Sequence, residues 1–141
     1  MSKLLDGVNH IAVLTRDADR FIRFYQEAFD AEVVSDNRKH GGSEGERMVV
    51  MTLGGPSQFN VFQVPGNTQP SVQTPMFGRG RIDHFGLNAG SREQLEEIRQ
   101  RLIRLGASDG TVTDFGRSLS VFFRDPDGLE AEVLWTKDVS S

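Results

Sequence analysis

Two stretches of the chain carry apolar residues at intervals of three and four positions, the spacing of one face of a helix. In residues 17–29 the apolar positions are Phe21, Phe24, Tyr25, Ala28 and Phe29. In residues 91–105 they are Leu95, Ile98, Leu102 and Leu105. The second stretch begins with the capping-box sequence Ser91-Arg92-Glu93-Gln94 and stops at Gly106. We therefore predict two amphipathic helices, over residues 17–29 and 91–105.

Short runs rich in β-branched and aromatic residues surround the helices and predict strands. These runs are residues 8–14, 48–53, 59–64, 82–88, 120–124 and 131–135. Turn-forming sequences separate neighbouring runs at Gly54-Gly55-Pro56 and at Asp125-Pro126-Asp127-Gly128. The order strand, helix, strands occurs twice, so each half of the chain is predicted to form a βαβββ module.

Two histidines mark the same place in the two halves. His10 is the third residue of Val-Asn-His-Ile-Ala-Val, and His84 is the third residue of Ile-Asp-His-Phe-Gly-Leu. The offset between them, 74 residues (84 − 10), also carries Asp17 onto Ser91, and both of these precede predicted helices. These echoes indicate an internal duplication.

The expected organisation is one domain over residues 1–141, with module one over about 7–64, a linker over about 65–81 and module two over about 82–135. The linker is rich in proline and glycine and has little periodicity. Residues 36–47, with Gly41-Gly42, are predicted to be a polar surface loop of the kind that often carries selectivity. His40, within that loop, is expected to be a surface residue.

Composition narrows the chemistry. The chain has no cysteine, so a metal would be held by imidazole, carboxylate, amide or water. The formal net charge of −4 argues against a nucleic-acid partner and favours a small molecule. The first residues do not resemble a signal peptide, and no apolar run approaches the length that spans a bilayer. We expect a soluble cytoplasmic protein with no membrane partner.

Several motifs together resemble the vicinal oxygen chelate superfamily, which includes glyoxalase I, bleomycin-resistance proteins, fosfomycin-resistance thiol transferases and extradiol dioxygenases. In chain order they are a strand beginning Val-Asn-His, a helix ending Phe24-Tyr25-x-x-x-Phe29, a second histidine strand, and Phe123-Arg124-Asp125-Pro126-Asp127-Gly128 before Glu132. The resemblance covers residues 7–135. It implies an α+β fold in which paired βαβββ modules form a half-open barrel.

The resemblance also implies one divalent metal ion, held by His10, His84 and Glu132. A fourth ligand position falls near Asn60, which lies 50 residues after His10, because Glu132 lies 48 residues after His84. Relatives with four protein ligands usually have Glu, Gln or His there. The amide of Asn60 is a weak, short ligand that reaches the metal only through water, or not at all. Two imidazoles and one carboxylate suit Fe, Mn, Ni or Zn.

Other charged residues are candidates for catalysis or binding. Strand alternation places Glu130 on the same face as Glu132, where it would act as a general base; the alternative is a solvated residue beside the turn. Five arginines are candidates to bind an anionic substrate. For each of them, the alternative is an ordinary exposed surface residue. These arginines are Arg47, Arg79, Arg81, Arg117 and Arg124.

Two classes of function follow. In the first, the metal chelates two neighbouring oxygens of a small substrate and stabilises an oxyanion. A glyoxalase-like reaction normally needs a carboxylate where Asn60 lies, which weakens that version. The three ligands fit an extradiol dioxygenase, but the additional histidine expected before the Asp-Pro-x-Gly turn is not found. A fosfomycin-type thiol transferase shares the three-ligand plan. The second class is a metal-free, bleomycin-resistance-like binding protein. The phenylalanine content and Trp135 keep this class open, whereas the intact set of His10, His84 and Glu132 argues against it. The resemblance implies a homodimer in either case.

Overall fold

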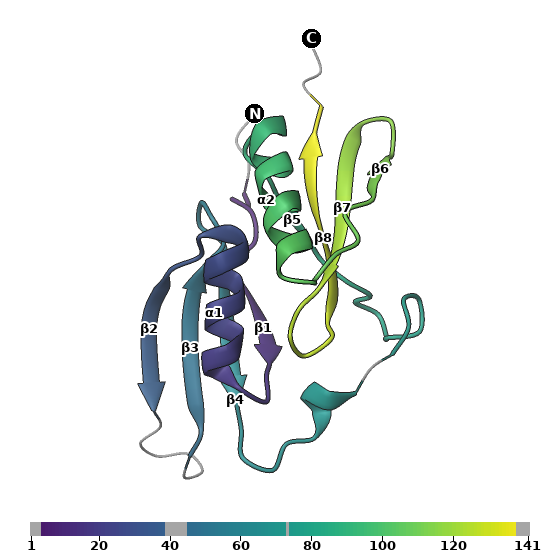
Figure 1. Cartoon of the computed structure of the whole chain (residues 1–141). Helices are drawn as coiled ribbons and strands as arrows, with labels where there is room; N and C mark the ends of the chain where they lie inside the picture. The colour runs from purple at the N-terminus through teal and green to yellow at the C-terminus, as the bar shows by residue number, and fades with distance from the viewer. Residues whose placement is uncertain (1–3, 39–44, 73, 138–141) are drawn as a thin grey trace. The chain divides into compact units, whose positions relative to one another are not determined.

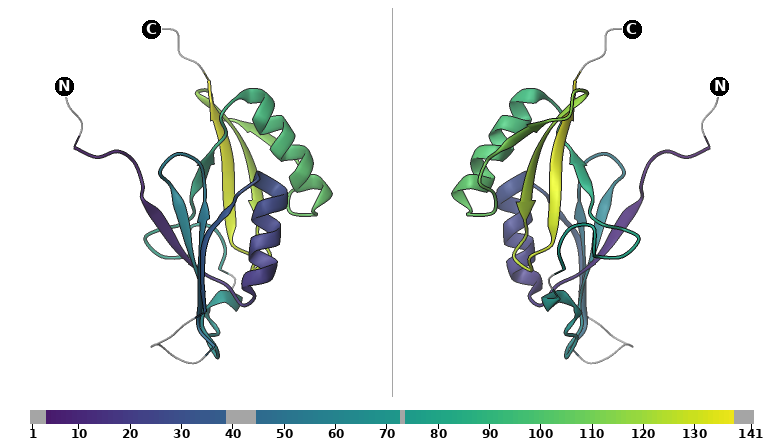
Figure 2. Two further views of the ribbon diagram at one scale, coloured as in Figure 1. Left: turned by 90° about the vertical axis from the view of Figure 1, so that its left-hand side faces the viewer. Right: turned by 90° about the vertical axis from the view of Figure 1, so that its right-hand side faces the viewer.

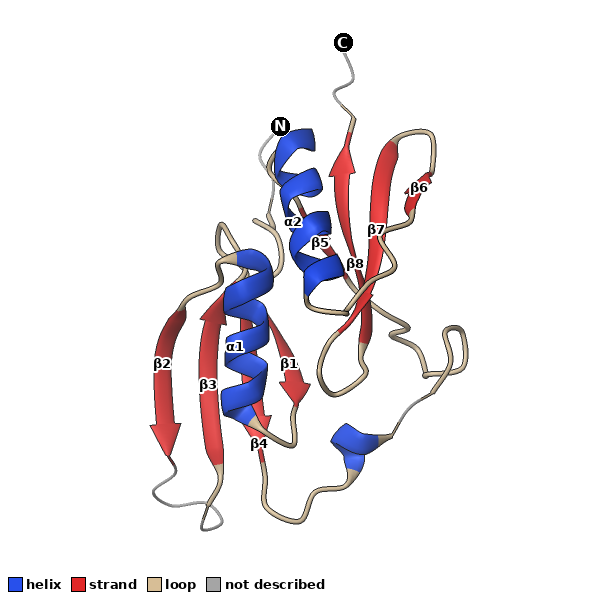
Figure 3. Cartoon of the chain, in the orientation of Figure 1, coloured by secondary structure: helices blue, strands red, loops and turns tan. Residues whose placement is uncertain are grey.

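The computed structural model describes residues 4–38, 45–72 and 74–137. The chain divides into two compact units, Met1–Val72 and Gln73–Ser141, and this boundary falls within the predicted linker. Each unit contains a four-stranded mixed sheet and one α-helix (Figures 1 and 3). The predicted α+β class and the repeated βαβββ order are therefore confirmed.

The first unit contains the sheet order β1-β4-β3-β2, in which β1 is parallel to β4 and the other neighbours are antiparallel. Its elements are β1 (His10–Leu14), α1 (Ala18–Phe29), β2 (Val33–Arg38), β3 (Arg47–Thr52), β4 (Gln58–Gln63) and the 3₁₀ turn η1 (Gln69–Ser71).

The helix α1 forms where the sequence places its cap and its apolar face. The side chain of Asp17 accepts a hydrogen bond of 3.1 Å from the backbone N–H of Arg20. On the buried face, the rings of Phe21 and Tyr25 lie 5.5 and 4.8 Å from the ring of Phe59 on β4. These aromatic contacts fix the helix on one face of the sheet and leave the opposite face uncovered by α1.

The second unit repeats the plan with the sheet order β5-β8-β7-β6, and β5 is parallel to β8. Its elements are β5 (Gly86–Asn88), α2 (Arg92–Arg104), β6 (Val112–Asp114), β7 (Ser118–Arg124) and β8 (Glu130–Thr136). Ser91 caps α2 by accepting a hydrogen bond of 3.1 Å from the backbone N–H of Gln94. The side views show α2 lying along one face of its sheet (Figure 2).

Two strands were not located by the sequence pattern. Residues 36–38, predicted to be loop, belong to the edge strand β2, and Arg47 is the first residue of β3. Every residue of β2 is exposed, so the strand lacks the alternation of apolar and polar residues that would reveal it. The strand β6 has only three residues. His40 lies outside the described residues.

The predicted strand over residues 82–88 is shorter than expected, because regular pairing in β5 begins only at Gly86. His84 therefore lies two residues before the start of the strand. The side chain of Asp83 accepts a hydrogen bond from the backbone N–H of Phe77, which draws this segment away from a regular ladder. The backbone N–H of Glu132 still donates to the carbonyl of Phe85 at 3.1 Å, so the segment stays beside β8.

The core and the candidate residues lie on opposite faces of each sheet. In the second sheet Val121, Ala131 and Val133 are at most 1% exposed, whereas Glu130 and Glu132 alternate with them on the other face. The face shared by Glu130 and Glu132 is the one that α2 does not cover. No described helix is long and apolar enough to cross a bilayer.

Candidate functional site

The second unit brings His84 and Glu132 together. Nε2 of His84 lies 3.2 Å from Oε1 of Glu132, and the two side chains are 23% and 14% exposed. The register explains the pairing, because Glu132 lies opposite Gly86, two residues after His84. A Cβ atom at Gly86 would lie only 2.6 Å from Cδ1 of Leu134 and 3.5 Å from Cγ of Glu132. Glycine therefore leaves room for Leu134, whereas Glu132 would be at an ordinary contact distance.

The other ring nitrogen of His84 is held by its neighbour in the sequence. Nδ1 lies 2.7 Å from Oδ2 of Asp83, and Oδ1 of Asp83 accepts the backbone N–H of Phe77. The hydrogen bond with Asp83 is the main cause that raises the pKa of His84, and Glu132 adds to it, whereas burial opposes both. The same hydrogen bond lowers the pKa of Asp83, and the backbone N–H of Phe77 and the charge of Arg79 contribute.

These contacts leave two acceptors facing each other. An ionised carboxylate only accepts hydrogen bonds, so Nδ1 of His84 donates to Asp83. In a neutral imidazole Nε2 is then unprotonated and points its lone pair at Oε1 of Glu132. Either a second proton on His84 or a cation bound by both atoms removes this repulsion. The donor set fits a divalent metal, since neutral imidazole nitrogen and carboxylate oxygen are common ligands of Zn and related ions.

Ser120 completes the arrangement around Glu132. Its hydroxyl is fully buried and donates a hydrogen bond of 2.5 Å to Oε2 of Glu132. This bond leaves Oε1 directed at His84. Ser120 was not among the predicted site residues; the available signal was its position two residues before Phe122, which is paired with Glu132 in the β7–β8 ladder.

The first unit carries the other two predicted ligands. His10 is exposed at the start of β1, and its Nδ1 lies 2.7 Å from Oδ1 of Asn9. Asn60 lies opposite Ala12, two residues after His10, in the same parallel register that places Glu132 opposite Gly86. Asn60 is thus the structural counterpart of Glu132. Within the described residues, no group of three or more His, Cys, Asp or Glu side chains could hold a metal ion.

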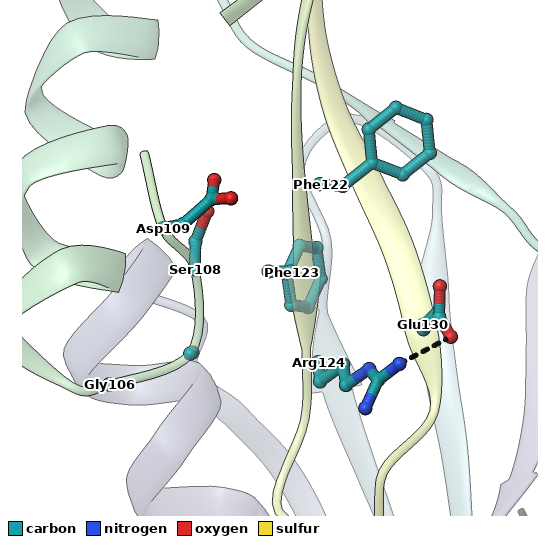
Figure 4. Close-up of a pocket in the computed structure, with 8 residues that line it drawn as sticks. Gly106, Ser108, Asp109, Phe122, Phe123, Arg124 and Glu130 are labelled. Carbon is teal, nitrogen blue, oxygen red and sulfur yellow. Dashed lines mark hydrogen bonds and ion pairs between the residues drawn. The ribbon is translucent and has the colours of Figure 1, made fainter. Parts of the chain in front are cut away.

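Glu130 shares the face of Glu132 but has different partners. Its Oε1 lies 2.8 Å from a guanidinium nitrogen of Arg79 and 3.1 Å from one of Arg124. Figure 4 shows Arg124 and Glu130 joined across β7 and β8 at the edge of a pocket. The pocket lies between residues 106–109 and β7, and its lining does not include His84 or Glu132.

The five arginines considered for an anionic substrate have different environments. Arg47 is 6% exposed, and its guanidinium is already paired with Asp19 and Asp36 of the first unit. Arg79 is nearly buried and donates to the carbonyls of Thr74 and Asp83. The remaining three, which are exposed, are Arg81, Arg117 and Arg124.

Comparison with known proteins identifies a family model and solved structures that match this chain. The family model of the Glyoxalase/Bleomycin resistance protein/Dioxygenase superfamily matches residues 7–133. No curated protein sequence matches significantly. A glyoxylase/bleomycin resistance protein/dioxygenase domain from Frankia sp. EAN1pec has a TM-score of 0.79 and 22% identity, covering 94% of this chain and 99% of that chain.

Two further solved structures share the fold at similar identity. Lactoylglutathione lyase from Agrobacterium tumefaciens has a TM-score of 0.59 and 22% identity, covering 94% of this chain and 96% of that one. A variant of the fosfomycin resistance protein FosX from Listeria monocytogenes, complexed with Mn(II) and 1S,2S-dihydroxypropylphosphonic acid, has a TM-score of 0.68 and 19% identity, covering 95% of each chain. With its family model matched over nearly its whole length, this chain belongs to the glyoxalase/bleomycin resistance protein/dioxygenase superfamily.

Proposed function

We propose that this protein is a divalent-metal-dependent enzyme of the vicinal oxygen chelate type that acts on a small oxygen-rich metabolite. In this proposal His10, His84 and Glu132 bind the metal ion. Asn60 supplies at most a water-mediated contact. Two adjacent oxygens of the substrate occupy the open coordination positions.

The observation that carries the proposal is the 3.2 Å separation between Nε2 of His84 and Oε1 of Glu132. Ligand atoms about 2.0–2.2 Å from one metal ion, at angles of about 90–110°, lie roughly 2.8–3.6 Å from each other. Both atoms are acceptors when His84 is neutral, and Asp83 and Ser120 hold the opposite ends of the two side chains. Outer partners of this kind are typical of metal ligands.

A bound metal would supply Lewis acidity at the developing oxyanion of the substrate. The chain's own residues prepare the site for that role: Glu132 brings a negative charge, and its hydrogen bond from Ser120 orients it. Mn(II) is the first ion to test, because the similar Listeria FosX variant binds it. Fe, Ni and Zn are the other candidates for this ligand set.

We propose Glu130 as the residue that accepts a proton from the substrate. Its carboxylate lies two residues before Glu132 on the same strand, so that the two side chains share one face of the sheet. It also pairs with the guanidinium groups of Arg79 and Arg124, which hold it in place. The chemistry that this arrangement supports is an isomerisation, lyase or thiol transfer rather than oxygen activation, since it pairs a base with a Lewis acid. Replacing Glu130 with Gln should abolish turnover and leave the metal content unchanged.

The test is metal analysis of protein purified without a histidine tag or chelator. Wild type should contain close to one metal ion per proposed site, and His84→Ala and Glu132→Gln should lose it while remaining folded in thermal melts. His40→Ala, which changes the third histidine of the chain, is the matched control and should retain the metal. Unchanged metal in His84→Ala would disprove the ligand assignment.

No bound metal, even after Mn, Fe, Ni and Zn are added back, would instead favour a metal-free binding protein of the bleomycin-resistance type. The homodimer and the cytoplasmic location stay predictions. Sedimentation velocity on the metal-loaded protein would test the first, and cell fractionation the second.

A further inference from the structure

We propose that Asn9 and Asp83 are positioning residues, each of which holds the proton of the following histidine on Nδ1. Nε2 of His10 and of His84 is thereby left as the metal-binding atom. The inference rests on the proposed metal site, but it concerns the tautomer of each imidazole, which is a property of the metal-free protein.

The same contact occurs once in each unit. Oδ1 of Asn9 lies 2.7 Å from Nδ1 of His10, and Oδ2 of Asp83 lies 2.7 Å from Nδ1 of His84. Residues 9 and 83 are separated by 74 positions (83 − 9), the offset that also relates the two histidines. His10 is exposed and His84 is partly buried, so a shared environment does not explain the repetition.

Distances decide which nitrogen of His84 keeps its proton. The imidazole lies between two carboxylates, with Asp83 at 2.7 Å from Nδ1 and Glu132 at 3.2 Å from Nε2. The shorter contact is the stronger charge-assisted hydrogen bond. When the ring is neutral, the remaining proton therefore stays on Nδ1, and Nε2 is free to bind a cation beside Glu132.

Asp83 is itself held in place by the segment before it. The backbone N–H of Phe77 donates to its Oδ1, and a guanidinium nitrogen of Arg79 donates to its carbonyl at 3.2 Å. Arg79 also donates to the carbonyl of Thr74 and pairs with Glu130. The end of the linker thus fixes the orientation of Asp83, and through it that of His84.

The two histidines receive different partners. Asp83 is a charged acceptor that makes the His84 imidazole a stronger electron donor, whereas Asn9 offers a neutral amide oxygen to His10. We therefore expect His84 to contribute more to metal affinity than His10, and Asp83 to be the more sensitive of the two positioning residues.

The experiment is long-range ¹H–¹⁵N correlation NMR of the imidazole rings in metal-free protein, at a pH above their titration. The ring signals are assigned with His10→Ala, His84→Ala and His40→Ala. In wild type, His84 should be the Nδ1–H tautomer. In Asp83→Ala the proton should move to Nε2, toward Glu132, whereas Asp83→Asn should restore the Nδ1–H form, because an Asn side chain already makes this contact at position 9.

The controls separate this inference from the proposed function. Glu132→Gln should leave the tautomer of His84 unchanged, and Asn9→Ala should shift only His10. Mn(II) titration should then show affinity lowered about 10–100-fold in Asp83→Ala and less than about tenfold in Asp83→Asn. An Nε2–H tautomer of His84 in wild type, or no change in either Asp83→Ala or Asn9→Ala, would overturn the inference. Correct tautomers without any Mn(II) binding would instead overturn only the metal site.

Discussion

Ser120, which is fully buried, donates its hydroxyl proton to Oε2 of Glu132 across the β7–β8 pair at 2.5 Å. The hydrogen bond occupies one carboxylate oxygen and leaves the other beside His84. The buried Ser120 therefore sets which carboxylate oxygen of Glu132 faces His84.

Replacing Ser120 with Ala should lower metal affinity about 10–100-fold, as is usual when the hydrogen-bond partner of a metal ligand is lost. The cost in folding free energy should be about 1 kcal/mol. Competition with a chelating dye measures the affinity, and urea unfolding measures the stability. Ser118→Ala, two residues earlier on the same strand face, should change neither; an equal loss of affinity there would contradict the role of Ser120.

Much of the fold follows from local patterns. The helices were predictable because Asp17 and Ser91 cap them and their apolar residues recur at helical spacing. The strand β2 was not, because it is an edge strand whose residues are all exposed. Periodicity records burial on one face, so an element without a buried face leaves no periodic signal.

The candidate site was predictable only in part, for a related reason. His10, His84 and Glu132 stand out in the sequence, and its offsets already place Asn60 near the position equivalent to Glu132. The strand register pairs Asn60 and Glu132 with equivalent residues of the two units. The contacts of Ser120 depend on which strands pair and in what register. Strand pairing is a long-range property, which a serine in an apolar run does not reveal.

The equivalence of Asn60 and Glu132 leads to a prediction about ligand number. Replacing Asn60 with Glu should increase metal affinity by about tenfold or more, equivalent to about 1.4 kcal/mol, because a charged ligand replaces a weak amide. Asn60→Ala should leave the affinity nearly unchanged if the site has three protein ligands. Isothermal titration with Mn(II) gives both values, and a large loss in Asn60→Ala would mean that Asn60 binds the metal directly.

Gly86 lies opposite Glu132, and a methyl group there would clash with the end of the Leu134 side chain and come into ordinary contact with Glu132. We expect Gly86→Ala to cost about 1 kcal/mol of stability, since the flexible end of Leu134 can move. Gly86→Val should cost more and also weaken metal binding by displacing Glu132. Ala12→Val, at the counterpart position beside Asn60, is the control. Normal metal affinity in Gly86→Val would show that Glu132 does not need this space.

Arg47 is a buried arginine that pairs with two exposed aspartates in the first unit. Its guanidinium makes two bonds to Asp36, of 2.9 and 2.7 Å, and one to Asp19, of 2.8 Å. Asp36→Ala should destabilise the protein by about 2–3 kcal/mol, because Arg47 stays buried with one exposed partner. Arg47→Met should change stability by only about 1 kcal/mol, since a chain of similar volume replaces the charge. Urea unfolding at neutral pH measures the free energy of unfolding of both variants. A larger loss of stability in Arg47→Met than in Asp36→Ala would contradict the prediction.

The same cluster predicts how stability responds to acid. The hydrogen bond from Arg47, followed by its charge, lowers the pKa of Asp36, and the pKa of Asp19 is lowered by the same guanidinium. Folding therefore favours the ionised aspartates. Their contribution is fully present above the ordinary aspartate pKa of 3.8 and is lost as the pH falls through the lowered values. Denaturant unfolding at a series of pH values below that point should show a smaller acid-induced loss in Arg47→Met than in wild type. Arg101→Met, which removes an ion pair with Glu97, is the control and should lose unfolding free energy with falling pH as wild type does. If wild type and Arg47→Met lost unfolding free energy equally as the pH falls, the Arg47 cluster would be excluded as the source of the acid sensitivity.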